Sequence, residues 1–88
     1  METLNENKMI AKFMNSNNSN IKYDENFNEL IPVIDKIYSM GYEFEIRYDE
    51  TYFKDPSEAE IISSSFGYGV LLNTFNAVVE FINWHNNY

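Results

Sequence analysis

Two pairs of carboxylates are the residues whose types and spacing most readily suggest chemistry. Glu43 and Glu45 alternate along one predicted strand, and Glu58 and Glu60 repeat that spacing in a segment that could pair beside it. Carboxylates at such positions lie about 6.6–7 Å apart on one strand face, which suits either acid–base catalysis or imitation of successive backbone phosphates. Catalysis needs one carboxyl with a raised pKa in a dry cleft, and a wet strand face does not provide it. A solvated face and a phosphate-imitating binding face remain the two open interpretations.

Metal chemistry has little support in this sequence. His85 is the only histidine and the chain has no cysteine, so the usual zinc ligands are missing. Near the end of the last predicted helix, His85 is expected to cap the helix or to pack beside Trp84. Asp49, Glu50 and Asp55 do not follow the spacing of an EF-hand loop, whose turn glycine is also absent. We predict no metal and no cofactor.

The candidate nucleophiles and phosphate-binding residues lack the neighbours that their chemistry requires. Ser63, Ser64 and Ser65 do not stand in a Gly-x-Ser-x-Gly turn, and no base is placed to activate them. Gly67 and Gly69 precede a predicted helix, but a single Gly-x-Gly is a weak phosphate signal and the negative chain opposes phosphate. We predict that the protein is not an enzyme.

Composition bounds the size and class of the protein. The 88 residues suffice for one domain, and 44% hydrophobic with 17% aromatic content is too apolar for a disordered chain. Without cysteine the core depends on packing alone. Residues 1–15 lack the apolar run of a signal peptide, and no segment approaches the ~20 apolar residues of a membrane span. We therefore expect a folded, cytoplasmic protein.

The charge balance restricts the partners. Six Lys and Arg stand against fourteen Asp and Glu, which gives a net charge of −8. Proteins bind nucleic acids and anionic lipids largely through Lys and Arg, so direct nucleic-acid binding and membrane binding are disfavoured. A partner protein with a basic surface suits this charge.

Periodicity predicts one α+β domain over residues 1–88. We expect a helix within 1–15, a flexible polar loop over 16–25, and the core in 26–88, which begins with a helix from Asn26 to Met40. Tyr42 to Tyr48 alternates strictly between apolar and polar residues, as a half-buried strand does. Two shorter strands, Thr51–Lys54 and Glu58–Ser64, and a long helix, Val70–Asn86, complete the order α-α-β-β-β-α. This order predicts a three-stranded antiparallel sheet covered on one side by helices.

Three stretches also resemble a group of short accessory proteins encoded by bacteriophages and prophages. The stretches are Lys8–Met14, Leu30–Ile37 leading to Gly41-Tyr42, and Asn76–Trp84. They are helix faces rather than catalytic signatures. The resemblance implies a phage accessory protein in an infected bacterial host, and small acidic phage proteins often resemble inhibitors of host defence, including anti-CRISPR proteins.

These observations predict a non-enzymatic inhibitor that binds a host nucleic-acid-handling complex such as a CRISPR effector. The partner-binding face would combine Glu43, Glu45, Glu58 and Glu60 with Tyr52 and Phe53 as apolar anchors. The alternative is a structural homo-oligomer, for example a homodimer, that packs through Phe81 and Trp84 on the wide apolar face of the last helix.

Overall fold

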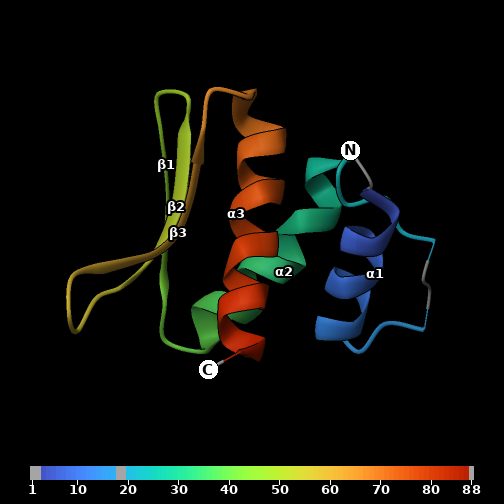
Figure 1. The fold of residues 1–88 in the computed structure, drawn as a ribbon, viewed down its shortest axis with the longest axis horizontal. Helices are drawn as coiled ribbons and strands as arrows, with labels where there is room; N and C mark the ends of the chain where they lie inside the picture. The colour runs from blue at the N-terminus through green and yellow to red at the C-terminus, as the bar shows by residue number, and fades with distance from the viewer. Residues whose placement is uncertain (1–2, 18–19, 88) are drawn as a thin grey trace.

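The described part of the chain folds into three helices and a three-stranded antiparallel sheet. The computed structural model describes residues 3–17 and 20–87. This is the predicted α+β class, and the predicted element order is confirmed (Figure 1). The elements are α1 (Thr3–Phe13), α2 (Phe27–Ser39), β1 (Glu43–Arg47), β2 (Glu50–Asp55), β3 (Glu60–Phe66) and α3 (Gly69–Asn86).

The sheet is a meander in which β2 lies between β1 and β3. Phe44 of β1 pairs with Phe53 of β2, which in turn pairs with Ser63 of β3. A register shift between Phe53 and Lys54 leaves one extra residue in β3. Asp49, in the tight turn between β1 and β2, has a φ of 51°, which Asp adopts more readily than most residues. The meander fixes which side chains share each face.

All three helices lie on the same face of the sheet (Figure 1). Helix α3 packs on β2 and β3, and α1 lies against the side of α3 that points away from the sheet. Because α3 is enclosed by its neighbours, its buried residues are not confined to one narrow stripe: they are Asn73, Thr74, Phe75, Ala77, Val78, Val79, Phe81 and Ile82. None of the helices in the described ranges combines the length and apolar character of a membrane span.

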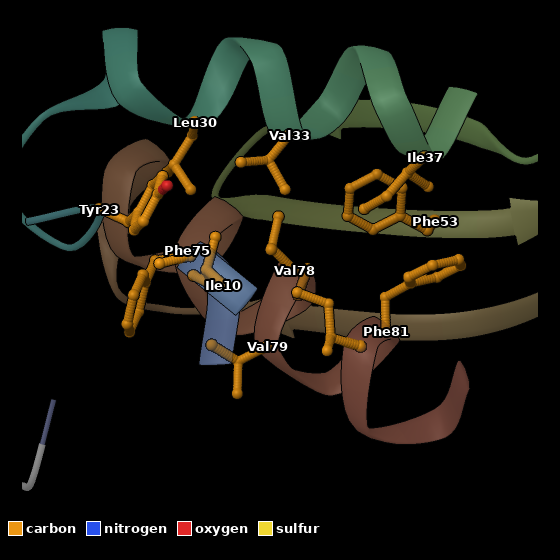
Figure 2. Close-up of a cluster of buried hydrophobic side chains, with 13 residues drawn as sticks. Ile10, Tyr23, Leu30, Val33, Ile37, Phe53, Phe75, Val78, Val79 and Phe81 are labelled. Atoms are coloured by element: carbon orange, nitrogen blue, oxygen red, sulfur yellow. The ribbon is translucent and has the colours of Figure 1, made fainter. Parts of the chain in front are cut away.

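The core draws on every layer of the molecule. Figure 2 shows Ile10 of α1, Leu30 and Val33 of α2, and Phe53 of β2 meeting the side chains of α3. We expected the core to lie within residues 26–88, but Ile10 is fully buried. Helix α1 is therefore part of the core, because it covers the side of α3 that the sheet leaves open.

The segment 16–25, predicted as a flexible loop, is anchored by Tyr23; residues 18 and 19 lie outside the described part. Tyr23 is 3% exposed. Its backbone N–H donates to Oδ1 of Asn7 at 3.0 Å, and Nδ2 of Asn7 donates to Oδ1 of Asp24 at 2.8 Å. A buried tyrosine and a bridging asparagine hold this connection against α1.

Strand β1 is less buried than its alternation suggests. Tyr42 and Phe44 are half-buried, whereas Ile46 is 39% exposed and Tyr48 is fully exposed. The reason is topological: β1 is an edge strand, and α3 covers β2 and β3. Alternation identifies the two faces of a strand but not how far another element covers them.

Candidate functional site

Glu43 and Glu45 lie on the face of the sheet that points away from α3, here called the outer face. Phe53 packs against Phe81 of α3, so the residues that alternate with it point the other way. Glu43 pairs across the ladder with Lys54, and Glu45 pairs with Tyr52. The two glutamates therefore share one solvent-facing surface, as their spacing predicts.

The structure does not bring Glu58 and Glu60 to this surface. Glu60 pairs with Asp55, one position beyond Lys54, and alternation therefore directs it to the opposite face from Glu43. Glu58 lies in the exposed turn between β2 and β3, which extends away from the helices (Figure 1). Because β2 separates β1 from β3, the predicted four-carboxylate face is corrected to a two-carboxylate face.

Helix α2 adds residues that the sequence did not single out. An open groove of about 440 Å³ lies along the edge strand β1 and is lined by residues of α2, β1 and β2. Asp35 and Tyr38, three residues apart on α2, stand on its helix side. The complete lining is Ile34, Asp35, Tyr38, Glu43, Phe44, Glu45, Tyr52 and Lys54. We call this surface the acidic groove.

Local structure explains why α2 stands beside β1. The side chain of Asn26 accepts a hydrogen bond from the N–H of Asn28 at 3.0 Å and so caps the start of the helix. At the other end, the N–H of Gly41 donates to the carbonyl of Tyr38 at 3.0 Å. Gly41 has a φ of 102°, which side-chain-bearing residues rarely adopt. The reversal there brings Asp35 and Glu43 to opposite sides of one groove.

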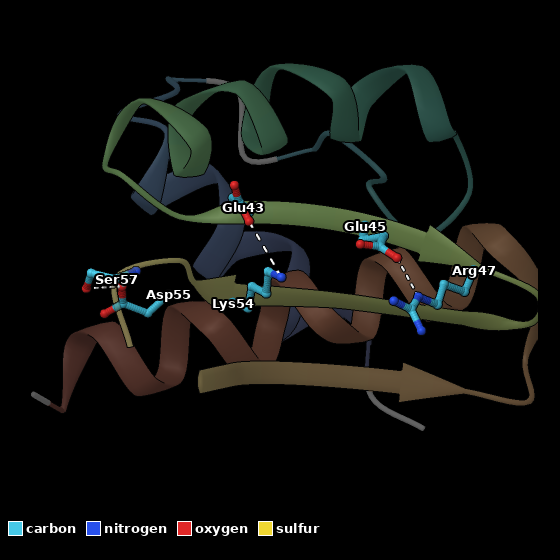
Figure 3. A network of polar contacts seen from close by, with 6 residues as sticks. All are labelled: Glu43, Glu45, Arg47, Lys54, Asp55 and Ser57. Carbon is cyan, nitrogen blue, oxygen red and sulfur yellow. Dashed lines mark hydrogen bonds and ion pairs between the residues drawn. The ribbon is translucent and has the colours of Figure 1, made fainter. Parts of the chain in front are cut away.

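The glutamates of the acidic groove are ion-paired on the outer face (Figure 3). Glu43 lies 3.7 Å from Nζ of Lys54, and Glu45 pairs with Nε of Arg47. Within the described residues, no ion pair involves Asp35. Among the described residues, the groove therefore holds one carboxylate outside any ion pair and two whose paired cations are themselves on the surface.

Tyr52 is almost enclosed although it belongs to the outer face. It is 6% exposed, and the guanidinium carbon of Arg47 lies 5.7 Å from its ring centroid. Hydrogen bonds from Arg47 and then Tyr52 lower the pKa of Glu45. Burial, followed by the bond to Glu45, raises the pKa of Tyr52. The ionised form of Glu45 is thus favoured, and Tyr52 is part of the groove lining.

Phe53, a predicted anchor, and Phe81, a residue of the alternative oligomer face, are both buried and cannot contact a partner. Phe53 is 0% exposed because it points toward α3, so its assignment as a surface anchor is wrong. Phe81 is also 0% exposed, and it contacts the rings of Tyr42 and Trp84 at centroid distances of 5.0 and 5.7 Å. The proposed oligomer face on α3 is therefore part of the core, with Trp84 half-buried at its margin.

The remaining chemical candidates have structural partners. The Ser63 hydroxyl donates to the carbonyl of Ala77 at 2.8 Å, and the hydroxyl of Ser65 lies 3.3 Å from Oδ1 of Asn73. The His85 ring stacks on Phe81 at 6.2 Å. In the described part of the chain, no three acidic or histidine side chains gather in a way that could hold a metal ion.

Asp49 and Asp55, two of the carboxylates considered and rejected as calcium ligands from the sequence, accept hydrogen bonds within turns. Oδ1 of Asp49 accepts from the N–H of Gly69 at 3.2 Å, and Oδ1 of Asp55 accepts from the N–H and hydroxyl of Ser57 at 2.9 and 2.7 Å. The bonds from Ser57 lower the pKa of Asp55. These carboxylates stabilise turns.

Comparison with known proteins gives no relative from which a role could be carried over. Searches with the chain found no matching family model, no matching curated protein and no matching solved structure.

Proposed function

We propose that the protein is a non-enzymatic binding protein that takes a Lys- or Arg-bearing segment of a partner protein into the acidic groove. The observation that carries this proposal is the meeting of Asp35, Glu43 and Glu45 with the ring of Tyr38 in one open groove. Tyr38 is 67% exposed. A guanidinium that stacks on such a ring while it bonds to a carboxylate combines two attractive contacts.

Lys54 and Arg47 shape the specificity of this groove. Each already neutralises one glutamate, so a partner cation gains most where it reaches Asp35 and where it displaces Lys54 from Glu43. Both ion pairs are at the surface, where such pairs contribute little stability. Replacing Lys54 or Arg47 by a cation of the partner therefore costs little free energy. A partner segment with several cations is favoured over a segment with one.

The biological setting that we propose follows the resemblance to phage accessory proteins and the net charge of −8. The partner would be a host complex that handles nucleic acid, such as a CRISPR effector, whose basic groove the protein occupies in place of nucleic acid. Its inhibition would require no bond to be broken or formed.

Binding to an arginine-rich peptide, measured by calorimetry, tests the groove. The variant Asp35→Asn/Glu43→Gln removes two charges from the groove, and the control Glu58→Gln/Glu60→Gln removes two from the distant hairpin. Long-range attraction falls equally in both, so only contact in the groove separates them. We expect the groove variant to bind about tenfold more weakly than the control. Equal affinities of the two variants would contradict the proposal.

The cellular proposal has its own test in a bacterium that carries active CRISPR interference against a phage. Expression of the protein should restore plaque formation, and the Asp35→Asn/Glu43→Gln variant should restore less than the hairpin control. If peptide binding behaves as expected but the wild-type protein leaves interference unchanged, the groove is still a binding site for basic segments, and the proposed host target is rejected.

A further inference from the structure

A second surface of the molecule is apolar and lies at the end opposite to Gly41. Here the turn between β1 and β2 meets the loop between β3 and α3 (Figure 1). Tyr48 is 100% exposed, Phe66 72% and Tyr68 66%, while Val70 and Leu72 in the first turn of α3 are 49% and 40% exposed. We call these five residues the apolar end. Large apolar side chains exposed at one end of a molecule are typical of interaction sites.

The backbone that carries these side chains is held by a polar network. The carbonyl of Asp49 accepts from the N–H of Gly67 at 3.1 Å. Asn73 is 0% exposed, its Nδ2 donates to Oδ1 of Asp49 at 3.3 Å, and its Oδ1 accepts from the N–H of Tyr68 at 3.2 Å. Two turns from distant parts of the sequence are thus tied together. A backbone fixed in this way loses little conformational entropy on binding.

The charge distribution indicates what covers the apolar end. Residues 61–79 contain no Asp, Glu, Lys, Arg or His, although the chain has 20 charged Asp, Glu, Lys and Arg residues (6 + 14). This stretch supplies four of the five exposed side chains of the apolar end. A contact between two copies of a chain with a net charge of −8 is opposed wherever carboxylates meet carboxylates. The exposed residues of this stretch, which lie within 61–72, can face their own copy without that repulsion.

We propose that the apolar end pairs with the apolar end of a second copy of this chain. A twofold contact needs a self-complementary patch, and an apolar patch is complementary to itself when, as here, four of its five residues belong to an uncharged stretch. The contact is made by side chains, because the extra residue in β3 near Ile62 interrupts the free edge of that strand and disfavours continuous strand pairing. The acidic groove stays open in the dimer, which therefore presents two such grooves to a partner.

Sedimentation equilibrium of the purified chain tests the pairing. We expect reversible dimerisation with a dissociation constant in the micromolar range, as is typical of small interfaces. Added salt should strengthen it, because salt screens the repulsion between two negative chains. Binding of a basic peptide to the groove should instead weaken with salt. Because salt is expected to act in opposite directions on dimerisation and on peptide binding, each proposal can fail without the other.

Two exposed tyrosines provide a matched pair of variants. Tyr68 in the apolar end is 66% exposed and Tyr38 on α2 is 67% exposed. The variant Tyr68→Ser should weaken dimerisation by about tenfold or more, and Phe66→Ser should do the same. Tyr38→Ser should leave it unchanged. Circular dichroism should show all three variants folded, because each removes a mostly exposed side chain.

Three results would overturn the proposal. One is a wild-type chain that stays monomeric up to about 1 mM, and another is equal weakening of the dimer by Tyr38→Ser and Tyr68→Ser. The third is a monomer that binds uncharged phosphatidylcholine vesicles through Phe66 and Tyr68, which would assign the apolar end to a lipid surface instead.

Discussion

The two ends of the contact between the sheet and α3 use aromatic residues in opposite ways. At the end near Gly41, the rings of Phe44, Phe53 and Phe81 pack inside, with centroid distances of 5.1 Å for Phe44 to Phe53 and 5.6 Å for Phe53 to Phe81. At the other end the interior is polar, and the aromatic side chains of Tyr48 and its neighbours face solvent. The aromatic surplus of the sequence is thus divided between closing the core and forming a surface.

Small polar residues make this division possible. The hydroxyls of Thr51 and Thr74 lie 3.3 Å apart where β2 meets α3, and Asn73 links the neighbouring loop to Asp49. The two threonines satisfy each other, and Asn73 is satisfied by Asp49 and by the N–H of Tyr68. Directional bonds fix loops, whereas ring packing supplies most of the burial energy. One end gives stability and the other gives a positioned surface.

The largest effect on stability is expected from removing a buried ring at the end near Gly41. Phe81→Ala removes a fully buried ring that contacts Phe53 and Tyr42, and it should lower the free energy of unfolding by about 3–5 kcal/mol. Phe66→Ala at the apolar end, a control of the same chemistry, should change it by no more than about 0.5 kcal/mol. Urea unfolding of both variants measures the two changes. Similar losses of unfolding free energy in the two variants would mean that both ends contribute equally to stability.

A smaller loss of unfolding free energy is expected when the polar network that holds the apolar end is broken. Asn73→Ala removes the bonds to Asp49 and to the N–H of Tyr68, which should cost about 1–3 kcal/mol because buried partners lose their hydrogen bonds. Amide exchange at Gly67 and Gly69 should accelerate as the loop loosens. Asn76→Ala, which removes one 3.4 Å bond to Ser65, is the control. If it accelerates exchange at Gly69 as much as Asn73→Ala does, Asn73 does not hold the loop.

The smallest effect appears only in alkali. Burial, followed by the negative charge of Glu29, raises the pKa of Tyr23 above its ordinary 10.0. A group whose pKa is higher in the folded state adds stability that is complete below the unfolded pKa and is lost as the pH rises through the folded one. Wild type should therefore lose stability above about pH 10, and Tyr23→Phe should lose less. Identical profiles over this range would show that Tyr23 ionises as readily in the folded chain as in the unfolded one.

The order of elements was predictable from sequence because it depends on local periodicity. Apolar spacing of three and four residues located α2 and α3, Gly41 marked the end of α2, and strict alternation located β1. These signals are carried by neighbouring residues and survive in any packing arrangement. The prediction that helices cover one side of the sheet followed from the same order.

The burial of individual side chains was harder to predict, because it depends on which helix or strand packs over each of them. Tyr52 and Phe53 are adjacent aromatics on a short strand, and only the position of α3 decides that Phe53 points inward. Phe81 looked like part of an unpartnered stripe because the sequence did not show that α1, α2 and the sheet surround α3. Asp35 entered the groove through a tertiary contact between α2 and β1. The uncharged run 61–79 can be read from the sequence, but only the structure shows which of its residues are exposed at the apolar end.

Photo-CIDNP NMR tests most directly the division of aromatic residues between inside and outside, because its signal arises only from rings that a dye can reach. In dilute solution, Tyr48, Tyr38 and Tyr68 should be polarised strongly, while Tyr23 and Tyr52, which are 3% and 6% exposed, should be silent. As the concentration rises, the signals of Tyr48 and Tyr68 should fall and that of Tyr38 should persist. Polarisation of Tyr23 or Tyr52 as strong as that of Tyr48 would contradict the account.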